Sequence, residues 1–126
     1  MNEKKIESYK DLIVWQKSVA LSIFIYRLTS KFPKEELYGL VSQIRRAVVS
    51  IASNIAEGYE RGRKLEYIRF LLIALASAAE LETQLIIAKE LGFVSREQFS
   101  EIPPRLNEIQ KMLKVLIRKV REWRSY

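Results

Sequence analysis

Few residues in this sequence could carry catalysis or bind a metal, because the chain contains no histidine and no cysteine. Histidine is the commonest general base and metal ligand, and cysteine supplies thiolate nucleophiles and zinc ligands. No glycine-rich phosphate loop occurs, and the basic turn at 61–64 lacks the spacing of a Walker motif. The residue types therefore argue against an enzyme, and we expect no metal and no other cofactor.

Carboxylates are the remaining candidates for metal chemistry. Glu57 could approach Glu80 or Glu82 if the helices that carry them lie side by side, and oxygen ligands suit magnesium. Glu80 and Glu82 stand about 200° apart around a helix and cannot chelate one ion together. Arg45 and Arg46 offer simpler partners, because arginine–carboxylate pairs satisfy both charges. We therefore favour ion pairs over a metal site.

Polar residues also lie beside the apolar positions of two predicted helices. Such groups fix the register of packed helices and the choice of partner. We predict a structural or interface role, with ligand binding as the alternative, for Arg45, Arg46, Asn54, Glu57, Arg61, Glu80, Glu82 and Gln84.

The net charge is +7, and the excess of basic residues lies in the first and last quarters of the chain. On the last predicted helix, basic residues recur at helical spacing on the side opposite the apolar positions. This basic stripe consists of Lys111, Lys114, Arg118, Lys119, Arg121 and Arg124. It could follow a phosphate backbone without recognising bases. The alternatives are an acidic protein, an anionic membrane, or a face that meets only solvent.

Two aromatic residues, Trp123 and Tyr126, lie on either side of Arg124, the last residue of the basic stripe. Trp123 continues the apolar spacing of the last predicted helix, so we expect it in the core. Stacking of Trp123 and Tyr126 on exposed bases is the alternative.

Four helices must position these residues. Apolar residues recur at alternating steps of three and four in segments at about 11–31, 34–60, 64–91 and 96–123. This pattern predicts an all-α fold, and the short connections predict an antiparallel, up-down-up-down four-helix bundle. We expect one domain over residues 1–126.

Local signals mark the ends of the predicted helices. Ser8 precedes Asp11 by three residues, the spacing of a capping box, and a second such pair at 95 and 98 opens the last helix. Pro33 suits the first turn of the second helix, and glycines at 58 and 62 mark its end. The prolines at 103 and 104 are expected to kink or restart the last helix.

The chain carries more apolar residues than a monomeric bundle needs. The stretches at 47–56 and 67–79 are apolar almost all round the helix, and such helices are buried almost all round. We therefore predict a subunit interface built from the second and third helices. The alternative is a bundle whose central helices are unusually well covered. Since residues 1–11 lack an apolar signal segment and no apolar run approaches the length of a membrane span, we expect a cytoplasmic protein without a membrane.

Several motifs together resemble the four-helix bundle proteins of the 23S rRNA intervening-sequence family. The resemblance covers about residues 9–118. The motifs that carry it are Asp11-Leu12, Trp15-Gln16-Lys17, Gly39-Leu40, Gln43-Ile44-Arg45-Arg46-Ala47, Ser50-Ile51, Ser53-Asn54-Ile55-Ala56-Glu57-Gly58, Arg61, Phe70-Leu71, Ile73-Ala74, Glu80-Leu81-Glu82-Thr83-Gln84-Leu85 and Leu91-Gly92. Ala76 departs from the family, whose members often have glycine there.

The resemblance implies a ring-like homo-oligomer, a pentamer, with no established enzymatic activity. A group with a similar fold, the accessory variability proteins of diversity-generating retroelements, works with a reverse transcriptase and nucleic acid. We expect a non-catalytic oligomeric scaffold that binds RNA or DNA. The alternatives are an adaptor whose basic face docks an acidic protein such as a polymerase, and a hydrolase that uses Glu57 and Glu80 with a metal.

Overall fold

A capping box opens the first helical region of the computed structural model, which describes residues 5–124. The Ser8 hydroxyl accepts a hydrogen bond from the Lys10 backbone N–H at 3.0 Å, and the Asp11 carboxylate accepts one from the Ser8 N–H at 3.1 Å. This confirms the predicted capping box. It closes a short 3₁₀ turn, η1 (Tyr9–Asp11), and the long helix α1 (Ile13–Thr29) begins two residues later.

The second long helix, α2 (Leu40–Arg61), begins later than the sequence predicts. The residues after Pro33 form only a 3₁₀ turn, η2 (Lys34–Glu36), so the prediction of a helix from about residue 34 is wrong. Gly39 precedes α2, and glycine is unfavourable inside a helix. The Glu36 carboxylate accepts a hydrogen bond from the Leu40 N–H at 3.3 Å and so caps the true start.

Two glycines with positive φ end the central helices. Gly62, at φ +71°, follows α2, and α3 (Lys64–Glu90) starts two residues later. Gly92, at φ +79°, lies just beyond the end of α3. Both are left-handed positions that favour glycine. Gly58, in contrast, lies inside α2 and is buried, so its assignment to the helix end is wrong.

The last helical region is broken in two, as the prolines predict. The second capping box is present, because the Ser95 hydroxyl accepts from the Gln98 N–H at 3.0 Å and Gln98 Oε1 accepts from the Ser95 N–H at 3.0 Å. It opens the single-turn helix α4 (Arg96–Phe99). The long helix α5 (Ile102–Arg121) then starts with the prolines in its first turn. Backbone N–H groups in the first turn have no hydrogen-bond partner within the helix, so proline, which lacks this group, is tolerated there.

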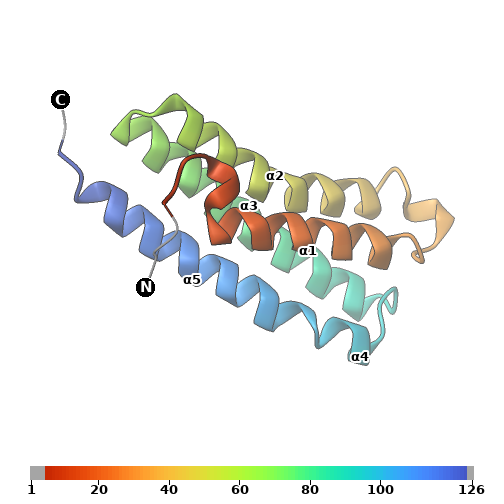
Figure 1. Ribbon diagram of the computed structural model, residues 1–126. Helices are drawn as coiled ribbons and strands as arrows, with labels where there is room; N and C mark the ends of the chain where they lie inside the picture. Colours follow the sequence, from red (N-terminus) through yellow and green to blue (C-terminus); the bar gives the residue numbers. More distant parts are fainter. Residues whose placement is uncertain (1–4, 125–126) are drawn as a thin grey trace.

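Contacts between the long helices establish an antiparallel four-helix bundle (Figure 1). Ser50 of α2 meets Ser77 of α3, and Gly58 near the end of α2 lies against Phe70 near the start of α3. Lys17 of α1 pairs with Glu108 of α5 at 2.9 Å. The pairs in contact are α1–α2, α2–α3, α3–α5 and α1–α5, of which α2–α3 is the most extensive and α1–α5 the least.

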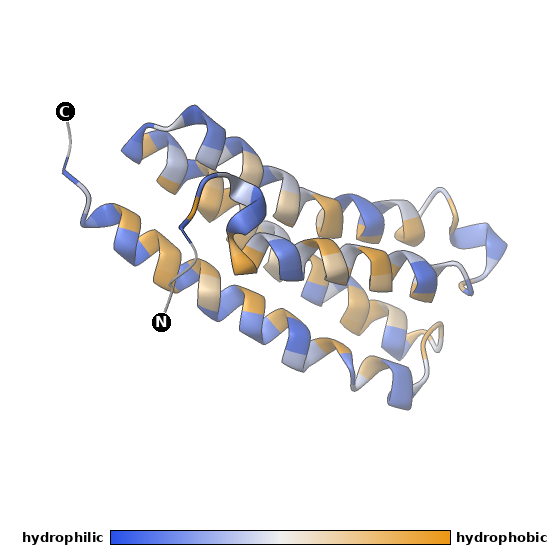
Figure 2. Ribbon diagram, in the orientation of Figure 1, coloured by the Kyte–Doolittle hydropathy of each residue, from blue (hydrophilic) through white to orange (hydrophobic). Residues whose placement is uncertain are grey.

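The core lies along the axis of this bundle. Figure 2 shows hydrophobic and hydrophilic residues alternating along each long helix, as expected for helices with one buried face. Large side chains that are almost fully buried come from all four long helices; they are Leu21, Ile25, Ile44, Ile51, Ile55, Leu71, Leu81, Leu85, Ile102, Leu106, Ile109 and Leu113.

Most of the apolar stretch at 47–56 is buried within the single chain, although Val49 is exposed. Ala47, Val48, Ile51, Ala52 and Ile55 are all buried within the single chain. The helix is apolar on more than one side because it packs against both α1 and α3. Burial within one chain accounts for most of this stretch, and the interface on the second helix stays a prediction.

Helix α3 is different, because it has an exposed apolar row besides its buried one. The exposed residues of this row are Leu72, Ile73, Ala76, Ala79, Ile86 and Ile87. Within residues 5–124, α3 is also the one helix long and apolar enough to cross a membrane by length and composition. The helix of a bundle core passes the same test, and the buried row of α3 contacts α2 and α5.

Candidate nucleic-acid interface

The basic stripe lies along the outer side of α5 and just beyond its end. All six side chains are exposed, whereas Leu113, Ile117 and Val120 of the same helix are buried. Arg118, Lys119 and Arg121 occupy the last turn. Positive charge is favourable there, because the carbonyl end of a helix carries partial negative charge.

Among residues 5–124, no ion pair neutralises the positive charge of the stripe. Across residues 5–124, the ion pairs involve Lys17, Arg61 and Lys89, and none reaches a residue of the stripe. The one acidic residue of α5 in an ion pair, Glu108, is held by Lys17 of α1. The stripe therefore projects a net positive field into solvent.

An open apolar groove runs beside the stripe, between the start of α1 with the residues before it and the second half of α5. It has a volume of about 820 Å³. Its apolar lining comes from Ile6, Leu12, Ile13, Val14, Met112, Val115 and Leu116. Lys111 and Lys119 of the stripe border it, together with Asp11 and Gln16. The groove can accept an apolar group that carries negative charge at its edge.

Trp123 does not continue the core, so the expectation for this residue is wrong. Helix α5 ends at Arg121, and the side chain of Trp123 is 47% exposed. Its ring lies against that of Tyr67, with centroids 5.7 Å apart at 53°. The Lys64 ammonium donates a hydrogen bond to the Trp123 carbonyl at 2.7 Å. Tyr126 lies outside the described residues.

Arg45 binds the end of a neighbouring helix rather than a carboxylate. Its Nε donates to Thr29 Oγ1 at 2.9 Å, and its Nη2 donates to the Tyr26 carbonyl at 3.2 Å. The guanidinium also lies 4.5 Å from the centroid of the Tyr26 ring. Arg45 thus satisfies a carbonyl in the last turn of α1, which is a structural role.

Asn54 belongs to a small hydrogen-bond network between α2 and α3. Its amide nitrogen donates to the Ser50 carbonyl and to Ser50 Oγ, each at 2.8 Å. Ser50 Oγ and Ser77 Oγ lie 2.9 Å apart across the two helices. Paired polar groups at this contact fix the register of the two helices.

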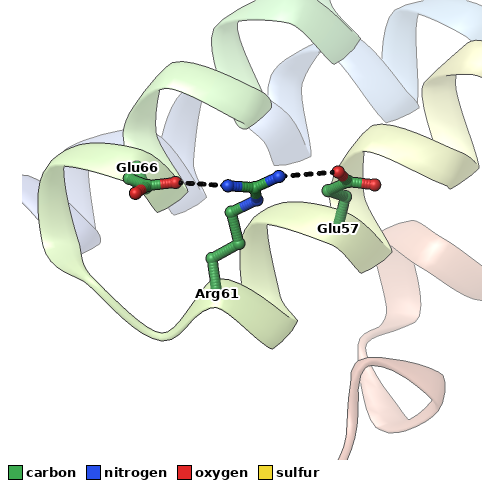
Figure 3. A network of polar contacts seen from close by, with 3 residues as sticks. All are labelled: Glu57, Arg61 and Glu66. Carbon is green, nitrogen blue, oxygen red and sulfur yellow. Dashed lines mark hydrogen bonds and ion pairs between the residues drawn. The ribbon is translucent and has the colours of Figure 1, made fainter.

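Arg61 links the end of α2 to the start of α3 (Figure 3). Its guanidinium donates to Glu57 at 3.2 Å and to Glu66 at 3.1 Å. The hydrogen bond to Glu57, followed by that to Glu66, raises the pKa of Arg61 above its ordinary value. Glu57 and Arg61 are exposed and Glu66 is half-buried, so we expect the network to orient the turn rather than to add much stability.

Four of the predicted polar residues are not brought to any other member of that set within residues 5–124. Arg46 and Glu80 are exposed and Glu82 is half-buried, and none of them forms an ion pair within residues 5–124. Gln84 is buried, and its Oε1 has no hydrogen-bond partner among the described residues. Glu57 pairs with Arg61.

Metal chemistry finds no support in this arrangement. The antiparallel register places Glu57 opposite the first turns of α3, far along the helix from Glu80. No group of three or more acidic, histidine or cysteine side chains that could hold a metal occurs in residues 5–124. The feature of the described residues that could bind a ligand is instead the exposed cationic face of the bundle.

Fold and surface together define a class, that of small four-helix bundles with one strongly basic helix. The model of the family described as 23S rRNA-intervening sequence protein matches residues 10–115, and the chain belongs to this family. This establishes the predicted resemblance.

A solved structure supports the assignment. It is the crystal structure of a protein of unknown function from the S23 ribosomal protein family of Bacteroides thetaiotaomicron. The two chains are 31% identical and superpose with a TM-score of 0.79, over 86% of this chain and 98% of that one. Among curated proteins, none matches the chain.

Proposed function

We propose that this protein is a non-catalytic, oligomeric scaffold that binds RNA or DNA through the basic stripe. The observation that carries the proposal is six exposed cations along one helix and its end, with no ion-pair partner among residues 5–124. Phosphate backbones are the polyanions that such a row fits, because binding releases their condensed counterions.

Little base specificity is expected of this surface. Lysine and arginine on flexible stems can follow phosphates at varied spacing, and phosphate contacts position a nucleic acid without reading its sequence. The resulting affinity falls steeply as salt rises.

Self-association is the second part of the proposal, and the exposed apolar row of α3 supports it. Leu72, Ile73, Ile86 and Ile87 are more than one-third exposed although they are large and apolar. The small Ala76 lies between them and would let another backbone approach closely. A ring that repeats this contact would display several basic stripes at once and raise avidity. The family resemblance favours five subunits.

The test combines light scattering with the binding of a labelled, mixed-sequence oligonucleotide, as RNA and as DNA. The parent should be an oligomer whose molar mass rises when nucleic acid binds at about 50 mM salt. At about 200 mM salt the nucleic acid should dissociate and the mass should return to that of the protein alone. The double variant Lys114→Glu with Arg118→Glu should bind at least about tenfold more weakly and show a shallower salt dependence. The matched control, Lys31→Glu with Lys34→Glu, makes the same charge change at exposed sites away from α5 and should keep more of the binding.

Two outcomes would refute the proposal. If the stripe variant and the control lose the same affinity, only net charge matters and the stripe is not a site. If the parent is a monomer, the apolar row of α3 is not an interface. Circular dichroism checks that each variant keeps its helices.

The groove beside α5 supports a second function, that of a protein adaptor. Its apolar lining and the lysines at positions 111 and 119 fit an amphipathic helix with acidic residues at its edge. Val115→Lys would block the groove without removing a stripe charge. The adaptor is favoured if the parent binds a labelled acidic amphipathic peptide but no oligonucleotide, and if Val115→Lys abolishes that binding.

A further inference from the structure

We infer that the end of the bundle at Trp123 binds an unpaired nucleotide, whose base stacks on the indole while neighbouring cations hold its phosphates. We call this the Trp123 site; its residues are Arg63, Lys64, Leu65, Trp123 and Arg124. The inference rests on the proposed function and deepens it, because it makes single-stranded nucleic acid the preferred ligand.

The indole is both exposed and fixed in place. The backbone on which the indole is carried is held at both polar groups, because the Trp123 backbone N–H donates to the Val120 carbonyl at 3.0 Å and the Trp123 carbonyl accepts from Lys64 at 2.7 Å. The ring lies against the buried Tyr67 at a tilt of 53°. Nearly half of the side chain still faces solvent. A large aromatic surface that is already positioned loses little entropy when a base stacks on it.

Cations surround the exposed indole. Arg63, Lys64 and Arg124 line a hollow of about 740 Å³ together with Trp123 and Leu65. Leu65 is 76% exposed, which extends the apolar surface beside the ring. This combination of an aromatic platform, an apolar neighbour and several cations suits a nucleotide better than it suits a purely apolar ligand.

One carboxylate, Glu66, also lines the hollow. It accepts a hydrogen bond from Arg61 at 3.1 Å, so its charge is already engaged (Figure 3). Three cations against one paired carboxylate leave the hollow positive. The start of α3 at Lys64 adds the partial positive charge of a helix N-terminus.

The Trp123 site continues the basic stripe. Arg121 and Arg124 are the last two residues of the stripe, and Arg124 lines the hollow. The end of α5 and the turn between α2 and α3 lie at the same end of the bundle (Figure 1). A strand that follows the stripe toward the end of α5 therefore arrives at the indole. Paired bases in a duplex are stacked on each other and cannot use it, so single strands and unpaired ends gain the extra contact.

Fluorescence can isolate this contact, because the chain contains only two tryptophans, Trp15 and Trp123. In a Trp15→Phe background, all tryptophan emission comes from Trp123. We expect a mixed-sequence single strand to quench this emission with the same midpoint as the anisotropy change of the labelled strand. The matching duplex should bind without comparable quenching.

Substitution of Trp123 provides the second readout. Trp123→Ala should weaken single-strand binding by roughly 5- to 100-fold, the effect of losing one stacked base, and leave duplex binding unchanged within about twofold. Trp123→Phe keeps an aromatic platform and packing against Tyr67, so it should lose less. Arg63→Glu should also weaken single-strand binding, and Arg96→Glu, an exposed change in α4, is its matched control.

The outcomes separate this inference from the proposed function. If the parent binds single strands without quenching, or if Trp123→Ala and Trp123→Phe bind them as well as the parent, the Trp123 site is overturned while the basic stripe stands. If single strands and duplexes lose equal affinity in Trp123→Ala, stacking is likewise overturned. If the parent binds no oligonucleotide at low salt, the proposed function itself fails.

Discussion

Gly58→Ala tests how closely α2 and α3 approach each other. A Cβ atom at this position would lie 2.8 Å from Phe70 Cβ, 3.1 Å from Tyr67 Cδ1 and 3.3 Å from the Tyr67 carbonyl oxygen. The nearest of these atoms is attached directly to the α3 backbone, so a side-chain rotation cannot relieve the contact. The two helices would have to move apart.

Two opposing effects decide the magnitude. Alanine in place of glycine favours a helix interior by about 1 kcal/mol. Overpacking a well-filled contact costs about 1–3 kcal/mol, and a carbon–carbon distance of 2.8 Å belongs at the upper end of that range. We therefore expect Gly58→Ala to lower the free energy of unfolding by about 1–2 kcal/mol.

Urea denaturation followed by circular dichroism is the assay, at one fixed protein concentration because self-association would shift the apparent stability. Ser53→Ala is the control, since Ser53 is exposed on the same helix and should change stability by less than about 0.5 kcal/mol. A Gly58→Ala variant that is more stable than the parent would refute the close approach of the two helices.

Two further variants test buried polar groups. Burial, followed by the nearby Tyr59, raises the pKa of Tyr67 to about 12. The unfolded chain releases this proton near pH 10, so stability should fall as pH rises from about 10 to about 12, by up to roughly 2–3 kcal/mol. Tyr67→Phe should remove that part of the decline, measured by urea denaturation at pH 8 and 11; an identical decline in both proteins would contradict it. Gln84→Met removes the buried Oε1 and should stabilise the protein by about 1 kcal/mol. A loss of stability would instead mean that Oε1 is bonded in the assembled protein.

Sequence patterns predict the bounds of the helices well where a residue has only one structural role available to it. Apolar residues recur at alternating steps of three and four along α3. The predicted bounds of this helix agree with the structure because Gly62 and Gly92, on either side of it, take left-handed conformations. Pro33 is ambiguous in this respect, since proline suits the start of a 3₁₀ turn as well as that of an α-helix. Gly58 is ambiguous too: a glycine near a helix end can stop the helix or admit a neighbour.

Features of the candidate site that depend on packing between helices could not be predicted. The spacing of Trp123 fits a continued helix, but the helix ends at Arg121 and the indole turns to the surface. Arg45 has the sequence context of an ion-pairing residue, and only the packing of α1 against α2 shows that it binds a carbonyl of α1. The basic stripe was predictable because spacing along one helix determines which residues share a face.

The packing of α2 against α3 at Gly58 also affects the Trp123 site. A Cβ atom at position 58 would press on Tyr67 Cδ1, and the Tyr67 ring is the surface against which Trp123 lies. If Gly58→Ala displaces Tyr67, the indole loses part of its support and the cost of ordering it for stacking rises. Among residues 5–124, no cation of the basic stripe lies over the ring of Tyr67 or of Trp123. Gly58→Ala should therefore weaken the binding of single strands more than that of duplexes, under conditions where the variant is fully folded. Equal losses for both ligands would mean that Trp123 does not depend on Tyr67 for its position.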